Sequence, residues 1–232
     1  MSRVIYLDDP EISVRLNENS RARRFTLRLA SQGDGAVLTL PPGVPLGEAQ
    51  SFLARHCDWL RSALARQPSA IIVRDGASVP VDGTMLRLRH IDGPRRAPEI
   101  RGSEIIVQGR AAPGPAIAAW MKERARASLI PSVRRYAALL GKEVQGVALK
   151  DTRSRWGSCS TTGRINLSWR LAMAPTRIQD YVAAHEAAHL VEMNHSQRYW
   201  DLLAGLMPDY RARRDWLRTE GRDLHRYRFT AR

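Results

Sequence analysis

Hydrophobic and polar residues alternate along the first part of the chain in a pattern that predicts β-strands. The segments EISVRLNEN (residues 11–19) and RRFTLRLA (residues 23–30) place apolar side chains at every second position. A third short run, AVLTLPPG (residues 36–43), ends at two prolines. We expect these runs to form an antiparallel meander. In residues 46–67 the apolar positions change to helical spacing, so one helix should follow the strands.

Strand-like patterns return in the next part of the chain. Short apolar runs at residues 79–93 and 99–109 are separated by Gly, Pro and Asp. The segment AAPGPA (residues 111–116) is the best candidate for a domain boundary. We therefore expect an N-terminal β-rich region with one helix at residues 1–112 and a second domain at residues 113–232.

The second domain reads as helices around a short sheet. A helix is predicted over residues 116–141, with Gly141 as its C-cap and with a kink or interruption at Pro131. Strands are expected between residues 144 and 174, and a helix over residues 175–193. Two more helices, at residues 197–207 and from residue 209, complete the chain. The expected fold class is α+β, in which N-terminal antiparallel strands with a helix precede this second domain.

The helix at residues 175–193 contains the pattern HExxH, as HEAAH at residues 185–189. His185 and His189 are four residues apart, so their imidazoles project about 40° apart on one helix face and can reach one metal ion. Glu186 lies about 100° from His185, which suits a carboxylate that takes a proton from a water activated at the metal. Two buried histidines and a buried glutamate would be costly without a partner. We therefore predict a zinc site with His185 and His189 as ligands and Glu186 as the catalytic base.

A catalytic zinc needs a third protein ligand, and His195 is the first candidate. On an unbroken helix His195 would lie about 9 Å along the axis from His189 and about 120° around it, out of reach of the same ion. The chain must therefore turn before residue 195. Asn194 in a left-handed conformation and Ser196 as the N-cap of the next helix would allow that turn. Glu192 is the alternative ligand, because it lies on the same helix face as the first two histidines.

Charge and cysteine content add little to this picture. The chain has 37 Lys and Arg against 23 Asp and Glu, a net charge of +14, which would attract nucleic acid or another polyanion through a basic surface. A general excess of arginine is the alternative explanation. Two distant cysteines exclude a disulfide framework and a four-cysteine zinc site. We find no apolar run long enough to span a membrane and no apolar signal core, so we expect a cytoplasmic protein without a membrane partner.

Several longer motifs resemble the YgjP-like metallopeptidase domain. They are RWGSC (residues 155–159), INLSWRL (165–171), DYVAAHEAAHL (180–190) and NHSQRYW (194–200), together with RARRFTLRL and TLPPGV near the N-terminus. The family is similar to the SprT-like proteases. The resemblance implies a zincin-like core that uses Zn²⁺, with His185, His189 and His195 as ligands and Glu186 as base. Ala187 departs from the bulky aliphatic residue that is usual within HExxH.

Residues for substrate binding are less well defined by the sequence. Zinc proteases of this build have a strand beside the cleft, and the strand within GRINLSWRL could pair with an extended peptide. Arg155, Ser158 and Trp169 are candidates on and around that strand, and Tyr210 could reach a developing oxyanion. Turn formation and core packing are the alternatives for these residues. Cys159 should also lie near the cleft, with the same alternatives, but a metal and water mechanism needs no cysteine nucleophile.

Two functions follow from these observations. The first is a zinc metallopeptidase that acts on a peptide or protein substrate. The second is a basic, nucleic-acid-associated module whose zinc is structural, or a protease that its basic surface recruits to DNA. A glutamate beside three ligands favours the first, and the net charge favours the second.

Overall fold

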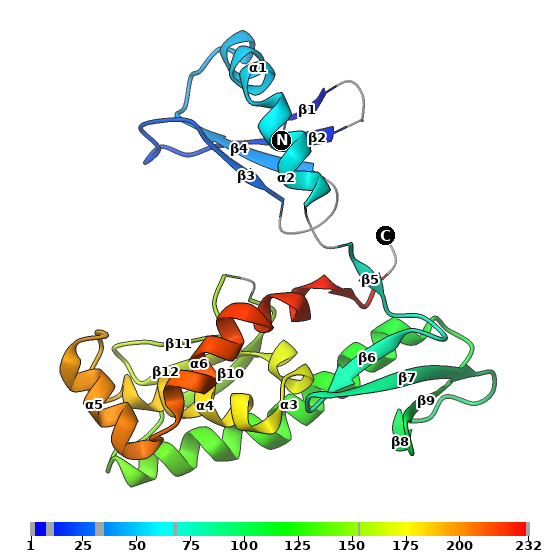
Figure 1. Ribbon diagram of the computed structural model, residues 1–232, viewed down its shortest axis with the longest axis vertical. Helices are drawn as coiled ribbons and strands as arrows, with labels where there is room; N and C mark the ends of the chain where they lie inside the picture. Colours follow the sequence, from blue (N-terminus) through cyan, green and yellow to red (C-terminus); the bar gives the residue numbers. More distant parts are fainter. Residues whose placement is uncertain (1–2, 8–11, 31–34, 67–68, 153, 231–232) are drawn as a thin grey trace. The chain divides into compact units, whose positions relative to one another are not determined.

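The computed structural model describes residues 3–7, 12–30, 35–66, 69–152 and 154–230. Figure 1 shows a mixture of helices and small sheets, which confirms the predicted α+β class. The chain forms two compact units, residues 1–69 and residues 70–232. The division therefore lies at residue 69, whereas the sequence pattern suggested a boundary after residue 112.

The first unit is a four-stranded sheet followed by two helices. Its elements are β1 (Val4–Leu7), β2 (Ile12–Glu18), β3 (Thr26–Leu29), β4 (Gly35–Leu40), α1 (Leu46–Arg55) and α2 (Cys57–Ala65). The strand order is β1-β2-β4-β3, and β2 and β4 run parallel. The expected antiparallel meander is therefore wrong at this pair, because β3 pairs with the outer edge of β4 and β4 returns beside β2.

The single helix expected at residues 46–67 is divided at His56. The Nδ1 atom of His56 lies 2.8 Å from the carbonyl oxygen of Phe52, and the backbone N–H of His56 donates to Leu53 instead. The imidazole thus competes for the carbonyl that a continuing helix would use. Leu53 and Leu60, one from each helix, are fully buried in the core of this unit with Val14 and Leu38.

The second unit begins with strands that belong to its own core. They are β5 (Ile71–Ile72), β6 (Ser78–Val81), β7 (Thr84–Ile91), β8 (Glu99–Arg101) and β9 (Glu104–Gln108), and the last four form a sheet of order β6-β7-β9-β8. Val79, Leu88 and Ile105 from this sheet are buried in one cluster with Ile117 and Met121 of the following helix. This shared core explains why residues 70–112 group with the rest of the chain.

The longest helix of the described residues, α3 (Pro113–Leu139), packs against the helix that carries HExxH. Its fully buried residues recur every four positions: Ile117, Met121, Ala125, Leu129 and Val133. The helix continues through Pro131, so the expected interruption does not occur; Leu129 and Val133, on either side of it, are both buried in the core. Gly141, just beyond the helix, has a φ of 63°, which confirms its predicted role as the C-cap glycine.

The remaining elements are one central helix, α4 (Thr176–Ala188), and the strands and helices near it. They are β10 (Gly146–Lys150), β11 (Gly157–Cys159), β12 (Arg164–Ser168), η1 (Trp169–Met173), α4 (Thr176–Ala188), α5 (Gln197–Leu206), α6 (Tyr210–Thr219), η2 (Gly221–Arg226) and β13 (Tyr227–Arg228). The sheet order β10-β12-β11 leaves β11 at an edge, and β13 pairs with β5. Figure 1 shows α4 between α3 and α6, and α4 also contacts α5 and β11. None of the described helices has the length and apolar character needed to cross a membrane.

Candidate metal centre and its pocket

The site is built on α4, which is buried on most of its surface. Ile178, Tyr181, Val182, Ala183, Ala184, Ala187 and Ala188 are all buried. The run of alanines allows α3, α5, α6 and β11 to approach the helix closely. The helix ends at Ala188 with His189 as its C-cap, earlier than the expected end at residue 193. HExxH therefore lies in the last turn of a rigid, buried element.

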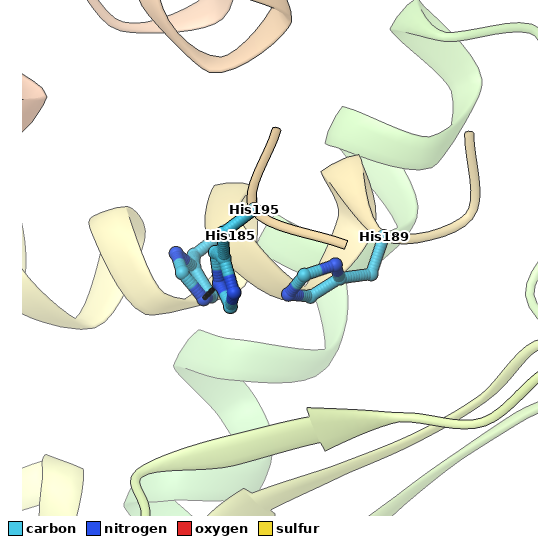
Figure 2. Close-up of side chains that lie close together, drawn as sticks. All are labelled: His185, His189 and His195. Atoms are coloured by element: carbon cyan, nitrogen blue, oxygen red, sulfur yellow. Dashed lines mark hydrogen bonds between the residues drawn. The ribbon is translucent and has the colours of Figure 1, made fainter. Parts of the chain in front are cut away.

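A reversal after α4 brings His195 back to the first two histidines, as the sequence required. Figure 2 shows the three imidazoles gathered together, two from α4 and one from the segment before α5. Asn194 does not adopt the expected left-handed conformation. Among the described residues other than glycine, only Asp82 has a positive φ. Instead, the side-chain oxygen of Asn194 accepts a 3.1 Å hydrogen bond from the N–H of Ser196. Ser196 occupies the N-cap position of α5, as expected, without a capping hydrogen bond from its side chain.

The three imidazoles are close enough together to surround one zinc ion. Their ligand nitrogens all lie within 4.8 Å of one another, and the Nε2 atoms of His185 and His195 are 3.2 Å apart. Two nitrogens that each lie about 2.1 Å from a tetrahedral zinc are separated by about 3.4 Å. A donor set of three imidazole nitrogens also suits zinc. The residues present therefore fit the ion.

Glu192 contributes its backbone to the site, and its carboxylate is outside the three-histidine group. The carbonyl oxygen of Glu192 lies 2.9 Å from Nδ1 of His189 and accepts a hydrogen bond from it. This bond holds the proton on Nδ1 and leaves Nε2 of His189 as the atom that could bind a metal. On the opposite side, the Tyr181 hydroxyl lies 3.4 Å from Nδ1 of His185.

Two aromatic residues of α5 hold the histidines in place. The ring of Tyr199 stacks on His189 at 4.6 Å between centroids, and its hydroxyl donates a 3.0 Å hydrogen bond to the carbonyl of His185. Trp200 stacks on His195 at 5.4 Å. These contacts depend on the reversal after α4, which brings α5 and His195 beside the first two histidines.

Burial sets the protonation of the site. Burial, followed by the charges of its neighbours, lowers the pKa of His185 to about 3, and the same causes lower the pKa of His195. Both imidazoles are therefore neutral at physiological pH, the form that binds metals. Glu186 is 4% exposed, and burial raises the pKa of its carboxyl group to about 8, against the opposing charge of Arg155. Its Oε2 atom has no hydrogen-bond partner among the described residues.

A pocket of about 620 Å³ opens beside these groups. Besides residues of α4, His189 and His195, three parts of the chain line it: residues 154–159, the turn after α4, and α6 with the η2 turn. These residues are Ser154, Arg155, Trp156, Gly157, Ser158, Cys159, Met193, Arg214, Leu217, Arg218, Arg222 and His225. Two of the predicted substrate-binding residues, Arg155 and Ser158, are among them. Gly157 and the three arginines were not among the predicted site residues, although Arg214, Arg218 and Arg222 recur every four residues.

The other two predicted substrate-binding residues do not line the pocket. Trp169 is 3% exposed and packs edge-on against Phe229 in the core. Tyr210 is 6% exposed, and its ring stacks on Trp200 at 5.5 Å. Both aromatic side chains thus have the packing role that was their alternative.

Cys159 lines the pocket as a protonated thiol. Burial, followed by the charge of Glu186, raises the pKa of its thiol to about 11. The thiol is therefore un-ionised at neutral pH and a poor nucleophile.

A known protein family matches most of the chain. The family model described as the YgjP-like metallopeptidase domain matches residues 23–220. The chain belongs to the YgjP-like family. The match includes both the three histidines and the arginines of α6. A comparison with curated proteins gave no match.

Proposed function

We propose that this YgjP-like protein is a zinc-dependent peptidase that hydrolyses peptide bonds with Glu186 as general base. One observation supports this most directly: three imidazole nitrogens converge beside the buried side chain of Glu186, whose Oε2 atom has no hydrogen-bond partner among the described residues. A site of three protein ligands beside an open pocket is typical of catalytic zinc, whereas structural zinc has four protein ligands.

The residues divide the chemistry between them. His185, His189 and His195 would hold Zn²⁺, which supplies Lewis-acid polarisation of the scissile carbonyl and lowers the pKa of water. Glu186 takes the proton of the attacking water and delivers it to the leaving nitrogen. Its raised pKa suits both halves of this transfer, since a carboxyl group with a pKa near the working pH can accept and release a proton.

The edge strand β11 offers a position for the substrate. β11 pairs with β12 on one side and is the last strand of its sheet. A peptide in an extended conformation could add to its free side and continue the sheet along the pocket. Ser158 on β11 and Arg155 just before it would then contact the substrate, and both line the pocket.

Replacing Glu186 with glutamine tests the proposal. The amide keeps the size of the side chain but cannot accept the proton, so we expect turnover of an unstructured protein substrate to fall by about 100-fold or more. Zinc content, measured by elemental mass spectrometry, should stay at that of the wild type. Glu192→Gln is the matched control, because its carboxylate lies outside the histidine group. Full activity of Glu186→Gln would contradict the mechanism.

The alternative, a nucleic-acid-associated module with a structural zinc, lacks a fourth ligand in the part of the chain that the structure describes. The metal-binding group found there consists of the three histidines. The alternative therefore has no support from the site itself.

A further inference from the structure

One wall of the pocket is rich in arginine. Arg214 and Arg218 extend from α6, and Arg222 from the η2 turn that follows it. Arg155 lines the pocket from the segment before β11. Glu186 is the one carboxylate residue among the lining residues. The pocket beside the proposed catalytic base is therefore strongly positive.

None of these four arginines forms an ion pair with a carboxylate among the described residues, although the charge of Arg155 acts on Glu186. The ion pairs of that part of the chain involve other arginines, and all four pocket arginines are exposed. Arg213 shows the contrast: it lies on the same helix, outside the pocket, and pairs with Asp209 and Asp180. Arg214 and Arg218 are four residues apart, where like charges repel and destabilise a helix. A negatively charged ligand would remove that repulsion.

The arginines also lie close to the reacting centre. The guanidinium of Arg214 stacks over the ring of Trp200 at 4.6 Å, and Trp200 in turn stacks on His195. Leu217, on the same helix face, is buried and lines the pocket with Trp156. The pocket thus offers an apolar surface bordered by guanidinium groups, which suits a chain with both apolar and acidic side chains.

We propose that the substrates of this peptidase are acidic peptides, and that Arg155, Arg214, Arg218 and Arg222 bind aspartate or glutamate side chains close to the scissile bond. The proposal rests on the peptidase function proposed above. A guanidinium group presents paired N–H donors that match the two oxygens of a carboxylate, so several arginines in one pocket select for carboxylates.

The shape of the site favours a peptide over a nucleic acid. The four arginines all line one pocket of about 620 Å³. A pocket of this size accommodates a few side chains, and it lies beside an edge strand that can pair with a peptide backbone. A DNA duplex needs phosphate contacts spread along a surface.

The first test is a digest of a peptide library by the zinc-loaded full chain, with cleaved bonds identified by mass spectrometry. We expect aspartate and glutamate to be enriched close to the cleaved bonds. The double variant Arg218→Glu/Arg222→Glu should lose the enrichment or reverse it in favour of lysine and arginine. Arg134→Glu is the matched control, since Arg134 is exposed on α3 and does not line the pocket. Cleavage without an acidic preference would overturn the proposal and leave the peptidase function standing.

The second test separates binding from turnover. A fluorescent glutamate-rich peptide and its glutamine-rich counterpart are titrated with zinc-loaded Glu186→Gln protein. We expect the acidic peptide to bind about tenfold more tightly at low salt, and the preference to disappear in the Arg218→Glu/Arg222→Glu background. Equal binding of the two peptides would overturn the proposal. So would arginine-dependent binding of a DNA oligonucleotide that the acidic peptide does not displace. Arginine-dependent binding of the acidic peptide with no peptide cleaved by the wild type would refute the peptidase function, and with it the assignment of acidic peptides as substrates.

Discussion

A Cβ atom on Gly157 would lie 2.6 Å from both Cγ and Cδ of Glu186, so the glutamate side chain occupies space that only a glycine leaves open. Gly157 is the first residue of the edge strand β11, and Glu186 lies on α4. The contact fixes how far the proposed base can extend toward β11. The missing side chain at Gly157 thus leaves room for the carboxyl group of Glu186 on the neighbouring helix.

Gly157→Ala should therefore reduce activity without removing the metal. The new methyl group displaces Glu186, and a general base that is moved from its position loses much of its effect, so we expect kcat to fall by about 100-fold. Steady-state kinetics and zinc analysis of the same preparation measure the two quantities.

Gly146→Ala is the matched control for this substitution. Gly146 starts β10 in the same sheet, and a Cβ there would have no atom within 4 Å. Its activity should match that of the wild type. If Gly157→Ala retained full kcat, the packing of Glu186 against β11 would have no catalytic importance.

Removal of His195 should release the metal. The side chain is one of three proposed ligands, and two remaining histidines form an incomplete set. We expect about one zinc per chain in the wild type and well under half of that in His195→Ala after dialysis against a weak chelator. His90→Ala serves as control, because the His90 ring lies beside the carbonyl of Gly109 and outside the histidine group. Undiminished zinc in His195→Ala would assign the third ligand elsewhere.

Cys159 should be dispensable for turnover. Its thiol has a pKa of about 11 and stays protonated at neutral pH, so it cannot act as a thiolate nucleophile. Cys159→Ser should keep kcat within about threefold of the wild type. Treatment with iodoacetamide at pH 7 should modify Cys159 slowly for the same reason. Loss of all activity in Cys159→Ser, with zinc retained, would point to a direct role for the thiol.

Asp180 should stabilise the second unit, because it joins three helices. Its carboxylate accepts hydrogen bonds from Ser132, Arg135 and Tyr136 of α3, and it forms an ion pair with Arg213 of α6. Asp180→Ala leaves the Tyr136 hydroxyl without this acceptor. We expect the free energy of unfolding to fall by about 1–3 kcal/mol, measured by urea denaturation.

Asp215→Ala is the control for this loss of stability. Asp215 is exposed on α6, and its side chain makes no ion pair among the described residues. Its effect should stay within about 0.5 kcal/mol of the wild type. Equal effects of the two substitutions would show that the hydrogen bonds of Asp180 contribute nothing specific.

The correct and incorrect predictions differ in the range of the interactions they depend on. The C-cap at Gly141 and the helical positions of His185, Glu186 and His189 follow from the chain's immediate neighbourhood, and the structure shows them as expected. The predicted antiparallel meander is wrong at the parallel pair of β2 and β4, because periodicity alone does not specify which strand pairs with which. The break at His56 arises from a side chain that competes for a backbone carbonyl, which the apolar pattern does not reveal.

By itself, the sequence determined the α+β class, the helix with two histidines and a glutamate at fixed offsets, and the need for the chain to turn before His195. Helix geometry repeats every 3.6 residues, so spacing alone places those groups. Only the tertiary structure decided that Tyr199 packs against all three histidines and that Gly157 meets Glu186. It also decided that Arg214 and Arg218 of α6 line the pocket, whereas Trp169 and Tyr210 do not. These relationships join separate elements, and they are set by how the helices and the sheet pack around α4, which local patterns along the chain do not encode.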